Sequence, residues 1–242
     1  MNLVHLPRSL ALATMAFTLL TMGPSRAQSE CCLVADIGGT AQVPPACPDG
    51  YVDGQSVRLN GLPPGIPITA TLSIINIQNV VEGPGGALGG TTQTWDAILR
   101  LHLEGDPTYP YDRVFLIPVS CSSDAAPRAA AAPVQSFQME LTGLQGQVAP
   151  GDPDFDLLRV IAGSGFGLPS PGHTTLTKVG AMWAVDSFFD ITYRIDYIGH
   201  SPGPFGGYSN SQTESYQPFE MCHEHATPAR ASSWGAVKSL YR

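Results

Sequence analysis

The sequence predicts an all-β fold, either an antiparallel β-sandwich or a jelly-roll-like domain, on three observations. Glycine and proline contribute 26 and 22 of the 242 residues, whereas charged residues make up 13%, about half of the usual share. Runs of β-branched and aromatic residues recur between these breakers at strand-like lengths. No run shows the i, i+3, i+4 spacing of apolar residues that an amphipathic helix needs. We therefore expect strands and turns, with little helix beyond the N-terminal segment.

The N-terminal segment, residues 1–27, has the features of a secretory signal peptide. Arg8 supplies a positive start, residues 9–22 form an apolar stretch shorter than a membrane span, and the small residues Ser25 and Ala27 mark a cleavage site. We expect the mature protein in the periplasm or outside the cell. No later stretch of the sequence is long and apolar enough to span a membrane.

Strand signals recur between residues 31 and 141. In chain order they cover 31–37, 55–60, 67–77, 91–103, 111–120 and 137–141. In the fourth of these, Leu99, Leu101 and Leu103 alternate with polar and charged residues, which is typical of a strand with one face in the core. The fifth is almost entirely apolar and is expected to be central. The segment 122–133, which contains four successive alanines, is expected to be a mobile surface loop.

The clearest strand spans residues 188–197, where apolar and polar residues alternate strictly. This period of two predicts one face in the core and one face in water. Its expected partner is the segment 155–162, which is largely apolar on both faces. The apolar residues of 188–197 are Phe189, Ile191, Tyr193, Ile195 and Tyr197, and the polar ones are Asp190, Thr192, Arg194 and Asp196.

A loop rich in glycine and proline, residues 163–172, connects this predicted pair of strands. Its breakers exclude a helix or an uninterrupted central strand. A loop held between two strands can carry a binding site. Turn chemistry alone also explains the composition, and we favour the turn.

The alternation ends after residue 200, where the chain gains Ser, Pro and Gln. Such a composition buries too little apolar surface to offset the entropy lost on ordering. We therefore expect a β-sandwich-like domain over residues 28–207 and a mostly disordered tail over residues 208–242.

Several motifs carry a resemblance to a known domain. They are GDPDFDLLRV from Gly151, AGSGFGLPSPGHTTLT from Ala162 and AVDSFFDITYRID from Ala184, with DIGGTAQVPPACPDGYVDGQSVRLNGLPPGIPI and LTGLQGQV upstream. They resemble an uncharacterised β-rich domain of secreted proteins from environmental bacteria, planctomycetes among them, over Asp36 to Gly199. The resemblance implies export and supplies no catalytic residues. It also implies a final strand that closes the domain, a pattern from which the sequence after residue 200 departs.

The chain is acidic. After the predicted signal peptide it has ten Lys and Arg against twenty Asp and Glu, a net charge of −10. Because binding to a phosphate backbone needs clustered cations, we do not expect a nucleic-acid partner.

Five cysteines are present, which is an odd number for an exported protein: Cys31, Cys32, Cys47, Cys121 and Cys222. An oxidising compartment favours disulfides. We predict the pair Cys47–Cys121, because each residue adjoins a predicted strand within the region of resemblance. A bond between the adjacent Cys31 and Cys32 would be strained, so one of them could pair with a distant cysteine. No CxxC motif indicates a redox cysteine.

Asp152, Asp154 and Asp156 alternate in the segment GDPDFD and are the candidate metal ligands. Calcium takes several oxygen ligands, which an acidic loop with Gly and Pro can supply. The segment lacks the glycine and the distal glutamate of an EF-hand loop. A solvated turn between strands is the simpler interpretation, and calcium is the one candidate cofactor.

The same carboxylates suit a carbohydrate-hydrolysing site, which needs two acids about 5–10 Å apart. Trp95, Trp183, Tyr109 and Tyr111 could form a platform for a sugar ring, although aromatic residues of a β domain more often lie in the core. Residues 222–225, Cys-His-Glu-His, offer zinc or copper ligands, but no second ligand pair is evident, so we regard them as incidental.

The leading hypothesis is therefore a secreted, non-enzymatic module that is structural, surface-associated or binding, with a cell-surface polymer or another secreted protein as its partner. The alternative is a protein that binds or hydrolyses carbohydrate with the acidic loop around Asp152 to Asp156. A sandwich fold does not decide between them, because unrelated functions share it.

Overall fold

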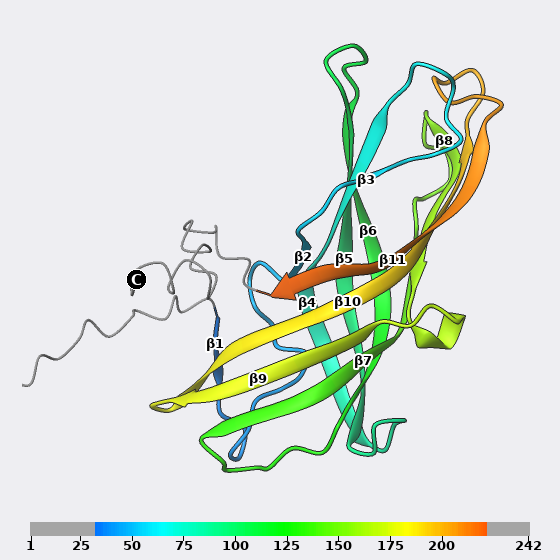
Figure 1. Ribbon diagram of the computed structural model, residues 1–242. Helices are drawn as coiled ribbons and strands as arrows, with labels where there is room; N and C mark the ends of the chain where they lie inside the picture. Colours follow the sequence, from blue (N-terminus) through cyan, green and yellow to red (C-terminus); the bar gives the residue numbers. More distant parts are fainter. Residues whose placement is uncertain (1–31, 222–242) are drawn as a thin grey trace, which may run out of the picture.

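The computed structural model describes residues 32–221, and this part of the chain is all-β and antiparallel (Figure 1). The predicted fold class is confirmed, whereas the predicted signal peptide lies outside the described residues. The helical element within 32–221 is a short 3-10 turn, η1 (Ser164–Phe166), and no helix in this range could cross a membrane. The strands are β1 (Leu33–Ala35), β2 (Tyr51–Asp53), β3 (Val57–Arg58), β4 (Ile68–Pro84), β5 (Thr91–Gly105), β6 (Asp112–Ala125), β7 (Val134–Gln147), β8 (Phe155–Ala162), β9 (Pro171–Val179), β10 (Met182–Gly199) and β11 (Ser209–Met221).

The sheet closes on itself because β10 has strand partners along both of its edges. One edge pairs with β11, and the other pairs with β8 and β9. From β11 the sheet continues through β2, β4, β5, β6 and β7 to β8, which returns to β10. In Figure 1, β4, β5 and β6 cross the diagonal strands β9, β10 and β11, and one hydrophobic core joins residues of both groups.

β10 follows the alternation that the sequence predicts. All five apolar residues of its inner face are buried. Its partner is β8, as predicted, with Tyr193 opposite Ala162. The polar face is less exposed than expected, since Asp196 is also buried. Its carboxylate accepts hydrogen bonds from Arg159 at 2.8 Å and from the Ser211 hydroxyl at 2.6 Å, and these bonds offset its loss of water.

β8 and β9 share one position between β7 and β10, like a single strand interrupted by residues 163–170. β8 ends with Ala162 opposite Leu144 of β7, and β9 begins with Pro171 opposite Glu140. Ser170 bridges the interruption. Its N–H donates to the Glu140 carboxylate at 2.9 Å, and its hydroxyl accepts the N–H of Thr192 in β10 at 3.1 Å.

The predicted disordered tail is wrong for residues 208–221, because Ser209–Met221 forms β11 and joins β10 to β2. Backbone pairing along β10 supplies the stability that the polar composition does not suggest. Side-chain hydrogen bonds add to it: the buried amide of Gln212 accepts the N–H of Asn60 at 2.7 Å and donates to the carbonyl of Arg58 at 2.9 Å. The domain thus extends beyond residue 207, and residues 222–242 lie outside the described part of the chain.

The predicted disulfide Cys47–Cys121 is also wrong, because Cys47 pairs with Cys32, with 5.7 Å between the Cα atoms. Cys121 is a buried free thiol. It lies in β6 on the core side, opposite Trp95 and Leu144 of the neighbouring strands. β6 continues to Ala125 and so includes part of the predicted loop 122–133.

Asp53 is a buried acidic residue of the short strand β2. It ends β2, which joins β11 by three residue pairs and β4 by two. The side chain is 3% exposed, and its Oδ2 has no hydrogen-bond partner. Burial raises the pKa of Asp53 to about 6, although the N–H of Gln55, 2.8 Å from Oδ1, favours the ionised form.

Removing this charge should change how stability depends on pH. Between pH 3.8 and about 6 the folded carboxyl holds a proton that the unfolded chain releases, so stability falls as pH rises through this window. We expect this group to lower the free energy of unfolding by up to about 3 kcal/mol between the two ends of the window. In Asp53→Asn that fall should be absent from urea unfolding curves measured on both sides of it.

The matched control is Asp49→Asn, at an exposed position shortly before β2. This variant should keep the pH slope of the wild type. A slope in Asp53→Asn equal to that of the wild type would show that the buried carboxyl does not titrate in this window.

Candidate functional site

A groove of about 650 Å³ crosses β4, β5, β6 and β7 on the side of the sheet that faces away from the core. Its floor residues alternate with core residues: Asp96 follows buried Trp95, and Ser120 and Ser122 flank buried Cys121. We call it the β4–β7 groove. Its lining consists of Asn79, Val81, Thr94, Trp95, Asp96, Ser120, Cys121, Ser122, Gly143, Leu144, Gln145 and Phe166.

Asp96 is the only acid among the lining residues, and two neighbours hold its carboxylate. Asn79 donates from Nδ2 at 2.9 Å, and the Ser120 hydroxyl donates at 3.1 Å. Asn79 reaches this position because the β4–β5 register shifts on both sides of Gln78, and its φ of 53° lies in the left-handed region that asparagine tolerates. An ionised carboxylate has about four acceptor positions, so acceptor capacity remains for a ligand.

The apolar side of the groove is formed by Phe166, which is 47% exposed, and by Val81, which is 66% exposed. Phe166 belongs to η1, in the interruption between β8 and β9. Close approach of this loop to β7 requires glycine at position 163, because a Cβ there would lie 2.6 Å from the backbone of Thr142. The loop 163–172, which the sequence predicts to be a turn, thus also contributes a side chain to the groove.

The groove offers hydrogen bonds and apolar contact, but no pair of catalytic groups. Its single carboxylate has no second acid beside it in the lining. Burial raises the pKa of the Cys121 thiol well above its ordinary value, and the nearby Asp96 adds to this effect. A thiol that stays protonated is a poor nucleophile. The lining thus contributes hydrogen-bonding and apolar groups.

Two of the three candidate metal ligands bind an arginine instead. Arg113 of β6 donates to both oxygens of Asp152, at 3.0 and 2.7 Å, and also to Asp154. Burial favours the neutral form of Asp152, but the Arg113 guanidinium and the N–H groups of Asp154 and Phe155 outweigh it and lower the pKa of Asp152. The cluster ties the β7–β8 turn to the start of β6.

The third candidate, Asp156, bonds to His200 at 2.7 Å. Within residues 32–221 no group of three His, Cys, Asp or Glu side chains is placed to share a metal ion. The calcium site itself remains a prediction. What the structure shows is that a cation would have to displace Arg113 from Asp152 and Asp154.

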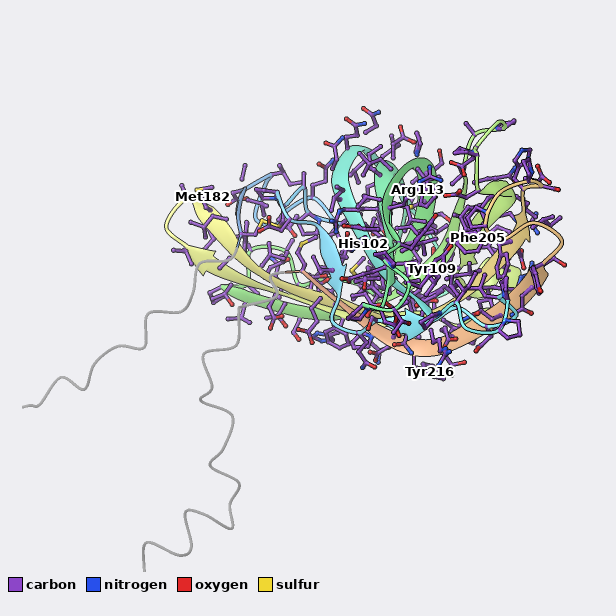
Figure 2. The ribbon with its side chains drawn as sticks, turned by 90° about the horizontal axis from the view of Figure 1, so that it is seen from above. His102, Tyr109, Arg113, Met182, Phe205 and Tyr216 are labelled. Atoms are coloured by element: carbon purple, nitrogen blue, oxygen red, sulfur yellow. A yellow bond between two sulfur atoms is a disulfide. The ribbon has the colours of Figure 1, made fainter. Side chains whose placement is uncertain are left out.

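Aromatic residues surround the arginine cluster and belong to the packing of the domain. The Tyr111 hydroxyl donates to Asp154 at 2.8 Å, and its ring meets Phe205 edge to face at 5.2 Å. In Figure 2, Arg113, Tyr109 and Phe205 lie in the same half of the molecule, away from Met182 at the tip of the β9–β10 hairpin.

The other candidate residues fall into two groups. Trp95 and Trp183 are core residues, at 2% and 1% exposed, and Tyr109 and Tyr111 are partly buried against the core. The predicted preference for core aromatics is confirmed for the two tryptophans. The Cys-His-Glu-His segment at 222–225 lies outside the described residues.

Sequence reasoning missed the β4–β7 groove, although each strand of its floor was predicted at least in part. Asp96 and Ser120 are opposite each other in the β5–β6 register, but they are far apart in the sequence. The available signal was weak: polar residues on the outer face of predicted strands, and an exposed aromatic ring in the glycine-rich loop.

The comparisons with known proteins add no relative. No family model matches the chain, and neither a curated protein nor a solved structure is significantly similar to it. The resemblance drawn from the sequence motifs is therefore not tested by them.

Replacing Arg113 should destabilise the fold. Arg113→Met leaves the carboxylates of Asp152 and Asp154, whose side chains are 8% and 13% exposed, without their cation. We expect a loss of about 2–3 kcal/mol in the free energy of unfolding. Arg100→Met, on β5, is the matched control and should change it by less than about 0.5 kcal/mol. Equal effects of the two substitutions on the free energy of unfolding would show that the ion pairs of Arg113 do not stabilise the fold.

Calcium should not stabilise the wild-type protein, because Arg113 already neutralises the two inner aspartates. A ligand that binds only the folded state raises the melting temperature by mass action. We expect the same melting temperature in millimolar calcium and in chelator. A rise of several degrees in calcium that disappears in Asp152→Asn would instead establish the metal site predicted from the sequence.

Proposed function

We propose that this protein is an exported, non-catalytic module that binds a carbohydrate polymer of the cell surface in the β4–β7 groove. The observation that carries the proposal is the combination, in one open groove, of an exposed aromatic ring, Phe166, with a carboxylate, Asp96, that keeps free acceptor positions. A sugar ring has hydroxyl groups at its edge and an apolar face of C–H groups, so it needs both kinds of contact.

The polar floor supports this ligand class. Ser120, Ser122 and Gln145 add hydroxyl and amide groups that both donate and accept hydrogen bonds. The hydrogen bonds from Asn79 and Ser120 fix the orientation of Asp96 before a ligand arrives, which lowers the entropy that binding costs.

The groove lining contains a single acidic residue, which favours binding without hydrolysis. A glycoside hydrolase of the usual kind places two carboxylic acids on opposite sides of the scissile bond, whereas Asp96 is the only acid of this lining. The alternative site around Asp152 to Asp156 is less suited to either role, since Arg113 and His200 bind its carboxylates.

Export is supported by the signal-peptide features of residues 1–27 and by the Cys32–Cys47 disulfide, a bond that persists in oxidising compartments. The net negative charge of the chain fits a neutral polymer better than an anionic one, because like charges repel at the surface.

An array of immobilised neutral and N-acetylated oligosaccharides tests the proposal. We expect binding by the wild type, and weakening of about tenfold for Phe166→Ala through lost apolar contact. Asp96→Asn should weaken it by a similar factor through loss of charge-assisted hydrogen bonds. Thermal melting should show that both variants remain folded.

The matched control is Phe188→Ala. Phe188 is also an exposed aromatic residue, but it lies on β10, where its ring stacks on His173. Binding should be unchanged in this variant. Either a complete lack of binding by the wild type or equal weakening in all three variants would contradict the proposed site.

A further inference from the structure

The polar end of the β4–β7 groove is rich in hydrogen-bond acceptors. Asn79 and Ser120 each donate to one oxygen of the Asp96 carboxylate, at 2.9 and 3.1 Å. Ser120 has a single O–H group and spends it on this bond, so its oxygen can only accept further hydrogen bonds. The side-chain carbonyl of Asn79 and the remaining lone pairs of Asp96 are acceptors as well. A ligand group at this end of the groove therefore meets mainly acceptors.

Within residues 32–221, no basic side chain forms an ion pair with Asp96. The lining of the groove also contains no Lys, Arg or His. The charge of Asp96 reaches into β6, where burial and, after it, this charge raise the pKa of the Cys121 thiol. A positive ligand group with several donors would complement this end of the groove, because charge-assisted hydrogen bonds are stronger than neutral ones.

The aromatic side of the groove lies close enough to Asp96 for one sugar ring and its substituents to reach both. Asp96 is opposite Ser120, and Ser122, two residues further along β6, is opposite Gly143. Two residues of a strand span about 7 Å. Gly143 has no side chain, and a Cβ there would lie 3.9 Å from the ring of Phe166. A sugar ring that packs on Phe166 above Gly143 can thus present a substituent to Asp96.

We propose that the β4–β7 groove selects a polymer with free amino sugars, whose ammonium group binds Asp96 while the sugar ring packs on Phe166. An ammonium group has three N–H donors, a positive charge and no acceptor, which matches the acceptors and the charge at this end. A hydroxyl or an N-acetyl group carries no charge and brings an acceptor of its own. This inference rests on the proposed function, because it names the class of sugar that the same groove prefers.

Three hexasaccharides with the same β-1,4-linked backbone test the selection, since they differ only at C2: a hydroxyl in the glucose hexamer, an N-acetyl group in the N-acetylglucosamine hexamer and an ammonium in the glucosamine hexamer. Affinities are measured by calorimetry at about pH 6, below the usual pKa of a primary amine. We expect the wild type to bind the glucosamine hexamer about tenfold more tightly than the other two.

Two variants separate the contributions of charge and apolar contact. In Asp96→Asn the preference for the glucosamine hexamer should fall to about one. Phe166→Ala should weaken the binding of all three hexamers and keep the preference. The matched control is Glu104→Gln, which removes the same charge from an exposed position on the same outer face of β5. This variant should keep both the affinity and the preference of the wild type.

Equal affinities of the wild type for the three hexamers would overturn the amine selection and leave the sugar-binding groove in place. A preference that persists in Asp96→Asn, or equally tight binding of hexalysine, would also overturn it, because the protein would then respond to positive charge alone. If none of the hexamers binds while the array retains other sugars, the amine selection fails. Lack of binding on the array as well would contradict the proposed function itself.

Discussion

The pairing of β10 along both of its edges is the constraint on which the rest of the structure depends. β11 covers one edge and the β8–β9 pair covers the other, so the sheet has no open side along most of this strand. An unpaired edge is a template for association with other chains, and closure removes it here. Closure also brings the inner faces together, which lets Phe189, Ile191 and Tyr193 pack against residues from the opposite side.

The same constraint creates the β4–β7 groove. Because β8 and β9 share one strand position, the residues between them must leave the sheet, and Ser170 returns the chain to both neighbours. The excursion holds Phe166 beside β7, while the bulges of β4 bring Asn79 to Asp96 on the other side. The groove thus depends on two irregular segments, the residues between β8 and β9 and the bulged part of β4. The regular strands between them hold both segments in place.

The sequence predicts local structure well where one residue in two is buried. The alternation of 188–197 identifies β10, its inner face and its partner β8, because a core-facing strand imposes that period. It does not identify β11, whose stability comes from pairing with residues far away in the chain, nor the Cys32–Cys47 bond, which depends on how a loop returns to β1. In the sequence alone, the alternating aspartates from Asp152 suggest a metal site. The pairing of Asp152 and Asp154 with Arg113 is not visible there, because Arg113 lies in another strand. For the same reason the groove, which four strands and a loop build together, is not visible in any one segment.

The most direct test of the proposed binding site is to follow the amide chemical shifts of the protein during titration with an oligosaccharide that it binds. We expect the shift changes to concentrate at Asp96, Ser120, Gln145 and the η1 loop. Changes that concentrate at the turn around Asp152 to Asp156, with the β4–β7 groove unchanged, would contradict the proposed site and would place binding at the acidic loop.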